Sequence, residues 1–197
     1  MKRIILVLVI LTAIGGTAFS FDILSFPSPI EKGDILVSPT VSFGRYWSWS
    51  TAVAITAAVD YALPIPIALT VGGEAGIALV LGDYSDLITL PIFARVAWHP
   101  NFEVPNLDPY VTLKLGYNIN LAGEEYHYGS YEVTYGGGFS YGGNVGVRYF
   151  FTPAISAFGE LGYDRYGVSY KERAGTWNYT YSYYIYTWFH AGVTFKF

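Results

Sequence analysis

Cysteine is absent from this chain, histidine occurs three times, and only 13% of the 197 residues carry a charge. Without cysteine the chain can form neither a disulfide nor a thiolate metal site, and it has no thiol nucleophile. Basic residues are also scarce, with 11 Lys and Arg against 15 Asp and Glu. Nucleic-acid binding needs clustered positive charge, so no nucleic-acid partner is expected.

Long hydrophobic runs are limited to the beginning of the chain. Residues 4–14 are apolar, follow Lys2 and Arg3, and precede the small residues Ala18 and Ser20. This pattern predicts a secretory signal peptide over residues 1–20, cleaved near Ser20. An uncleaved anchor is the alternative, and the small residues after the run disfavour it. No later run reaches the roughly 20 apolar residues of a membrane helix, although 52% of the chain is hydrophobic.

The remaining apolar residues recur at every second position. The clearest example is the end of the chain, where one face carries Phe189, Ala191, Val193, Phe195 and Phe197. Such alternation predicts a strand whose two faces meet different surroundings. Similar segments lie at 35–45, 51–63, 67–79, 87–99, 110–121, 139–151 and 154–166. The C-terminal segment itself extends back to about residue 179.

Each segment has about ten residues, which is the length that a tilted strand needs to cross a bilayer. In lipid every backbone N–H and C=O must be paired within the protein, so a sheet can span a membrane only if it closes. We therefore predict an all-β fold: a closed antiparallel up-and-down transmembrane β-barrel of eight strands over residues 33–197, after a short lead-in at 21–32. Its last strand must pair with its first. A tyrosine-rich soluble sandwich is the alternative, but the polar faces carry too few charges to cover a surface.

The connections and the aromatic residues fit a barrel in an outer membrane. Short connections with proline lie at 63–66 and 152–154, whereas longer polar ones, predicted as loops, lie at 80–87, 121–138 and 166–178. Outer-membrane barrels have short turns at one end, longer loops at the other, and a girdle of aromatic residues at each interface. The sequence predicts these girdle residues: Trp98, Tyr117, Tyr141, Tyr149, Tyr163, Tyr181 and Tyr183.

Six charged residues fall in the middle of predicted strands, on the polar face: Asp60, Glu74, Arg95, Lys114, Arg148 and Glu160. An eight-stranded barrel is just wide enough for side chains to fill it, and ionic groups in a dry interior must be paired. We predict a plug of salt bridges in the lumen; a selectivity or gating cluster is the alternative. Large residues on the same face either pack the core or line an apolar pocket: Phe93, Phe150, Phe158, Tyr186 and Trp188.

The signal peptide, the alternating segments, GGNVGVRYFF followed by FGELGY, and the terminal Phe197 together resemble the small outer-membrane barrels of the OmpA-barrel, OmpX and OmpW group. The resemblance implies an integral protein of the bacterial outer membrane, in contact with its lipid and lipopolysaccharide. It also implies that the aromatic C-terminal strand from Phe189 to Phe197 is a signal read by the barrel-assembly machinery. The peptidoglycan-binding domain that follows OmpA-type barrels is missing, so cell-wall anchoring is not implied.

The sequence indicates no catalytic, cofactor or metal site. His99 precedes a proline, His190 is expected to point into the lumen, and His127 lies three residues from Ser130, which places the two on opposite faces of a strand. None of these makes the outward His/Ser pair of lipid-A deacylases that share this fold, and Glu124 and Glu125 beside His127 indicate a solvated loop. No enzyme activity and no cofactor are expected, and a monomer is favoured.

Two functional classes are compatible with these features. One is a structural or surface-exposed barrel with tyrosine-rich loops at 121–138 and 166–178. The other is a narrow transporter for small hydrophobic molecules, as proposed for OmpW-type proteins. A lipid-A-modifying enzyme is the least favoured alternative.

Overall fold

The computed structural model describes residues 25–27, 29–46, 50–81, 87–122, 126–128, 131–174 and 177–197. The predicted signal peptide lies outside these residues. The strands are β1 (Ile35–Tyr46), β2 (Ser50–Ala62), β3 (Leu69–Leu81), β4 (Leu87–Trp98), β5 (Leu107–Ala122), β6 (Tyr126–Tyr128), β7 (Tyr131–Thr152), β8 (Ile155–Ala174) and β9 (Trp177–Lys196). In the part of the chain that these ranges cover, no helix is long and apolar enough to span a membrane.

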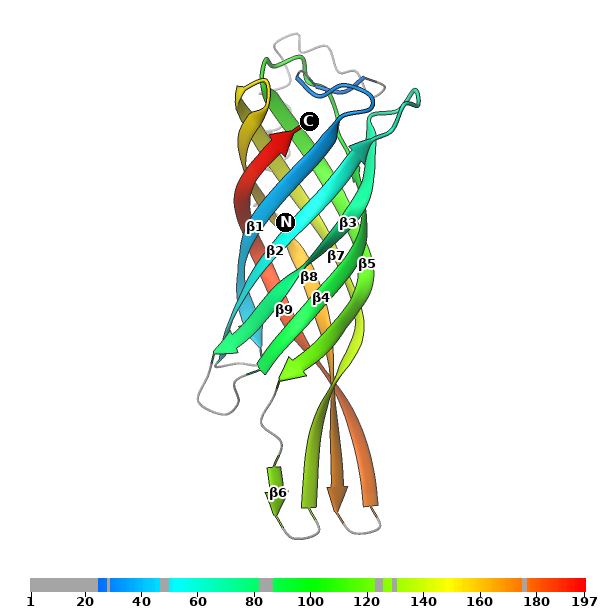
Figure 1. Cartoon of the computed structure of the whole chain (residues 1–197), viewed down its shortest axis with the longest axis vertical. Helices are drawn as coiled ribbons and strands as arrows, with labels where there is room; N and C mark the ends of the chain where they lie inside the picture. Colours follow the sequence, from blue (N-terminus) through cyan, green and yellow to red (C-terminus); the bar gives the residue numbers. More distant parts are fainter. Residues whose placement is uncertain are drawn as a thin grey trace, which may run out of the picture.

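The sheet closes on itself. Neighbouring strands follow the order β5-β4-β3-β2-β1-β9-β8-β7-β6, every pairing is antiparallel, and β5 also pairs with β7. Without the three-residue strand β6, the other eight described strands form a ring in which each strand has two partners (Figure 1). This confirms the predicted fold class and excludes the soluble sandwich.

The two faces of the wall differ as the alternation predicted. Along β2 buried and exposed residues alternate from Ala54 to Ala62. The exposed set is apolar, with Ile55 60% exposed, Leu113 63% and Leu161 67%. A soluble protein rarely shows a continuous apolar exterior of this size, and lipid is the solvent in which such a surface is stable.

The first and last strands form the seam of the barrel. β1 and β9 are paired from Leu36 with Lys196 to Tyr46 with Ile185. The predicted pairing of the last strand with the first is therefore confirmed. β1 starts and β9 ends at the same end of the barrel, the one with the short turns, which is at the top of Figure 1.

The prediction of long loops at 121–138 and 166–178 was largely wrong. Residues 131–138 of β7 pair with 167–174 of β8, and these pair with 177–184 of β9. The three strands continue past the end of the barrel, at the bottom of Figure 1, together with β6. We call this part, residues 126–128, 131–137, 168–174 and 177–183, the extension. Its residues are largely polar or aromatic because they lie beyond the apolar exterior and the lumen. A polar composition of this kind is typical of loops, which explains the wrong prediction.

Candidate functional site in the barrel interior

The structure places all six predicted lumenal charges inside the barrel. They are between 2% and 6% exposed: Asp60, Glu74, Arg95, Lys114, Arg148 and Glu160. Two carboxylates outside the predicted charge cluster are buried with them: Asp108, and Asp164, which the alternation had placed on the polar face. The described interior thus holds five carboxylates, two guanidinium groups and one lysine amino group.

Four of the predicted charges form one continuous network with Asp164. Arg95 on β4 lies 3.1 Å from Asp60 on β2, as an ion pair without hydrogen-bond geometry, and its Nη1 donates to Glu74 on β3 at 3.1 Å. Lys114 on β5 lies 2.9 Å from Glu74 and 2.9 Å from Asp164 on β8. The network therefore joins strands from opposite sides of the ring. Removing one partner of such a buried pair leaves an uncompensated charge.

A second network lies nearer the short turns. Arg148 donates to Asp108 at 2.8 Å, and the other oxygen of Asp108 lies 2.8 Å from Nδ1 of His99. The Arg148 guanidinium also lies 4.8 Å from the centre of the Tyr110 ring, whose hydroxyl donates to Glu160 at 2.8 Å. The role of Asp108 was missed because it lies between the predicted strands at 87–99 and 110–121, where no alternation predicts a strand. Asp108 is the second residue of β5, and its side chain faces the lumen.

His190 has the partners that a hydrolase triad would need, but this group cannot meet a substrate. His190 Nδ1 lies 2.6 Å from the Ser42 hydroxyl, and its Nε2 lies 3.7 Å from Asp164. His190, Ser42 and Asp164 are at most 1% exposed. A nucleophile needs an open position for the reacting carbonyl, so these groups act as interior hydrogen-bond partners.

Apolar side chains fill the interior on both sides of the charges. The end of the lumen next to the extension, which we call the loop end, contains a buried apolar cluster. Its members are Ala52, Ala54, Ala78, Val80, Leu87, Phe93, Tyr166, Val168 and Ile185. The turn end contains a second cluster of Phe26, Ile30, Leu36, Ala62, Ala68 and Phe150. From one end to the other, the lumen holds an apolar layer, the charge networks and a second apolar layer.

The segment before β1 packs against the turn end. Phe26 is 9% exposed and its ring centre lies 5.7 Å from that of His99. Asn101 donates to the Ser25 hydroxyl at 3.1 Å, and Lys196 donates to the Pro29 carbonyl at 2.8 Å. The described part of the predicted lead-in is therefore held at the barrel mouth.

The large aromatic residues predicted on the inner face divide into two groups. Phe93, Phe150 and Phe158 are buried inside. The prediction was wrong for the other two: Trp188 is 43% exposed, and the Tyr186 ring lies 5.2 Å from that of the outward-facing Tyr163. The register between β1 and β9 shifts near Trp188, and such a bulge reverses the alternation on which the prediction rested.

The predicted girdle residues occupy three positions. Trp98 and Tyr149 lie at the turn end of their strands, whereas Tyr117, Tyr141 and Tyr163 lie on the outer wall toward the loop end. Tyr181 and Tyr183 belong to the extension, beyond the closed wall. On the C-terminal strand, Phe189, Val193, Phe195 and Phe197 are exposed and Ala191 is half-buried.

The polar motif around His127 lies mostly outside the described residues. Glu124 and Glu125 lie outside the described residues, and nothing is described of the His127 side chain. Among the side chains that the structure does describe, no group of three or more His, Asp or Glu could hold a metal ion.

Solved structures show where this fold occurs. The chain is similar to the outer membrane protein OprG from Pseudomonas aeruginosa, with a TM-score of 0.62 and 12% identity over 89% of this chain and 99% of that one. It is similar to Neisserial surface protein A, with a TM-score of 0.57 and 15% identity over 83% of this chain and 96% of that one. It is also similar to the E. coli outer membrane protein W, with a TM-score of 0.57 and 14% identity over 85% and 99%.

The chain thus has the fold of the small eight-stranded outer-membrane barrels. No family model matches it. No curated protein matches its sequence. At identities of 12% to 15% the likeness establishes the fold, and the role of the protein must be argued from its own residues.

Proposed function

We propose that this protein is an integral barrel of a bacterial outer membrane, with a closed lumen and a structural or surface-interaction role. The observation that carries this proposal is the filled interior. Charge networks lie between two apolar layers, and the lead-in covers the turn end. A barrel of eight strands has room for side chains and little else, so this arrangement supports a plug rather than a pore.

Location in the outer membrane is supported by three features. The exterior is apolar, the fold occurs in outer-membrane proteins, and the sequence begins with a predicted signal peptide. The aromatic strand that ends at Phe197 is proposed to be the part that the barrel-assembly machinery reads. It forms the closing seam with β1, so its delivery would complete the ring.

The extension is the proposed interaction surface. On β9 the ring of Tyr179 stacks between those of Trp177 and Tyr181, at centroid distances of 6.4 and 6.3 Å. These rings are at least 44% exposed. Rows of exposed aromatic residues are typical of binding surfaces, because rigid rings give contact area at a small cost in conformational entropy.

Conductance in planar bilayers tests the closed lumen. The mature chain is refolded in detergent, and its folding is confirmed by a change in SDS-gel migration on boiling. We expect no steady channel current from the folded wild type. The matched variant Arg148→Ala removes the largest fully buried side chain and should increase leakage. Stable current steps in the wild type would contradict the proposal, and an open porin in the same bilayer provides the positive control.

Transport of small hydrophobic molecules is the second candidate, because the loop end of the lumen is apolar. Small side chains at Ala52, Ala54 and Ala78 contribute to this layer. Uptake of an apolar fluorophore into proteoliposomes distinguishes the two candidates. Uptake by the wild type that is lost in Ala54→Phe would favour transport, and equal background uptake in both would favour the closed barrel.

A further inference from the structure

The outer wall of the barrel carries a positively charged residue without a carboxylate partner among the described residues, at the point where the extension begins. Arg165 on β8 is paired across the sheet with Tyr141 on β7 and Tyr186 on β9. It follows Leu161 and Tyr163, which are 67% and 47% exposed, on the same outward face. Arg165 therefore lies at the edge of the apolar exterior.

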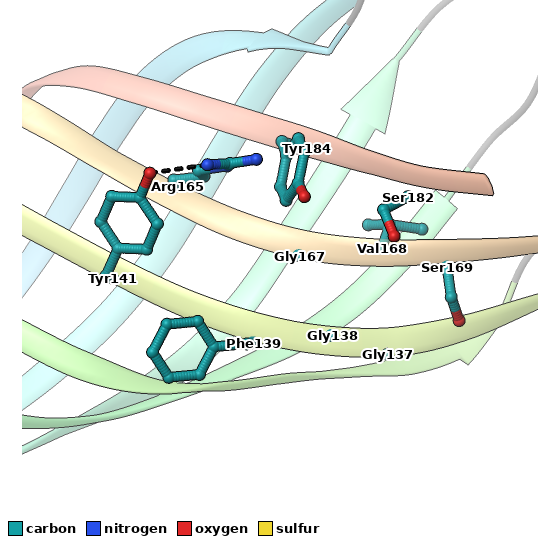
Figure 2. A pocket seen from close by; sticks show the side chains of 10 residues that line it. All are labelled: Gly137, Gly138, Phe139, Tyr141, Arg165, Gly167, Val168, Ser169, Ser182 and Tyr184. Carbon is teal, nitrogen blue, oxygen red and sulfur yellow. Dashed lines mark hydrogen bonds between the residues drawn. The ribbon is translucent and has the colours of Figure 1, made fainter.

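Tyrosine rings hold the guanidinium in place. Arg165 Nη1 donates to the Tyr141 hydroxyl at 2.6 Å, and its Cζ lies 3.1 Å from the centre of the Tyr184 ring. Figure 2 shows Tyr141 and Tyr184 on either side of it. None of the carboxylates in the described ranges forms an ion pair with Arg165. The side chain is thus oriented by neutral groups, and its charge remains available for an anion.

A pocket of about 200 Å³ adjoins this guanidinium. Gly137, Gly138 and Gly167 contribute no side chains to its lining, and Ser169 and Ser182 add two hydroxyls (Figure 2). Figure 2 shows these serines beyond the glycines, on the side away from Tyr141. A guanidinium and hydroxyl donors along one hollow form the kind of group that binds phosphate oxygens.

Two more cations share the outward face near this pocket. Arg45 on β1 is paired with the same Tyr186 that flanks Arg165, so the two arginines lie two strands apart, or about 10 Å. Lys171 lies six residues beyond Arg165 on β8, where alternation places it on the same face, and it is exposed. The chain is acidic overall, yet these three cations place positive charge at this edge of the apolar wall.

We propose that the Arg165 pocket binds the phosphate-bearing head group of an outer-leaflet glycolipid. The inference rests on the proposed membrane location and adds a ligand and its site. The pocket faces the side of the wall that lipid would contact, one step beyond the aromatic residues that mark the interface. Phosphate oxygens accept from Arg165 and the serine hydroxyls, with Arg45 and Lys171 alongside, while the acyl chains extend along the apolar wall.

Binding of lipid A to the full mature chain in detergent micelles tests the proposal, with bound lipids counted by native mass spectrometry. The variants are Arg165→Gln and, as a matched control, Lys32→Gln, which removes an exposed positive charge at the opposite end. We expect Arg165→Gln to bind lipid A about tenfold more weakly, and Lys32→Gln to bind like the wild type. Dephosphorylated lipid A should bind the wild type as weakly as Arg165→Gln binds lipid A.

Three results would overturn the proposal: equal lipid A binding by wild type and Arg165→Gln, equal binding of the dephosphorylated lipid, or displacement by millimolar inorganic phosphate. The last would assign the pocket to a free anion. Insertion of each variant into phospholipid vesicles is measured first, by flotation and gel shift. Failure of the wild type to insert would contradict the proposed function itself, and is therefore distinguishable from failure of the lipid site.

Discussion

Ile35 and Phe197 exchange both of their backbone hydrogen bonds, with N–O distances of 3.0 Å from Ile35 to Phe197 and 2.9 Å in return. Ile35 is the first residue of β1, and Phe197 follows the end of β9. This pair is therefore the outermost link of the seam at the turn end. In a closed sheet such links pair the backbone N–H and C=O groups that an open edge would leave unpaired in lipid.

Deleting Phe197 should weaken the seam. Two backbone hydrogen bonds are lost, and we expect the free energy of unfolding to fall by about 1–3 kcal/mol. The measurement is the urea midpoint of the barrel in detergent, together with the fraction that shifts on an SDS gel after boiling. Phe197→Ala is the matched control, because it retains the backbone. If both variants lose the same stability, the side chain rather than the backbone exchange holds the seam.

Lys114→Met should destabilise the barrel strongly. The substitution keeps the approximate length of the side chain but leaves Glu74 and Asp164 without the cation that lies 2.9 Å from each. Removing one partner of a buried ion pair costs about 3–5 kcal/mol, and we expect a loss in this range in urea unfolding. The exposed Lys171→Met is the control and should change stability little. Equal effects from the two would show that water reaches Lys114 and screens its charge.

Two glycines provide a matched test of how closely the strands approach. A Cβ added at Gly116 would collide with the backbone of Ile92 on β4, whereas one added at Gly159 meets nothing within 4 Å. We expect Gly116→Ala to reduce the yield of folded barrel severely and Gly159→Ala to fold normally. Refolding yield by gel shift is the measurement. Normal folding of Gly116→Ala would mean that β4 and β5 can separate without loss of closure.

The barrel was predictable because the alternation of faces is a local property of each strand. Ile55 and Asp60 are assigned to opposite faces by position alone, and the structure agrees. Bulges break this rule: one register shift in the β1–β9 pairing moved Trp188 to the outside. A bulge depends on a partner strand, so it cannot be read from one segment.

The interior was only partly predictable, for a related reason. Charged residues in mid-strand are visible in the sequence, but which of them meet depends on the registers of several strands. Asp164 lay on a predicted polar face, yet its role as the second partner of Lys114 requires β5 and β8 to meet across the lumen. Similarly, Arg165 is an ordinary surface charge in the sequence. Its tyrosine neighbours come from two other strands.

The lead-in provides the last prediction, at the turn end of the lumen. Phe26 packs beside His99 and belongs to the buried cluster with Phe150. Replacing Phe26 by Ala should cost about 3 kcal/mol of stability, because a large buried ring is lost and the cluster can close the gap only in part. It should also increase hydrogen exchange of the His99 backbone amide, which donates to the Ala68 carbonyl at 2.9 Å.

The matched control is Ile67→Ala, since Ile67 lies in the neighbouring turn and is 43% exposed. It should leave both the stability and the exchange rate close to those of the wild type. If Phe26→Ala behaves in the same way, the lead-in rests on the barrel mouth without closing it. The charge network around Asp108 would then meet water from the turn end, and the closed lumen would depend on the loop-end layer alone.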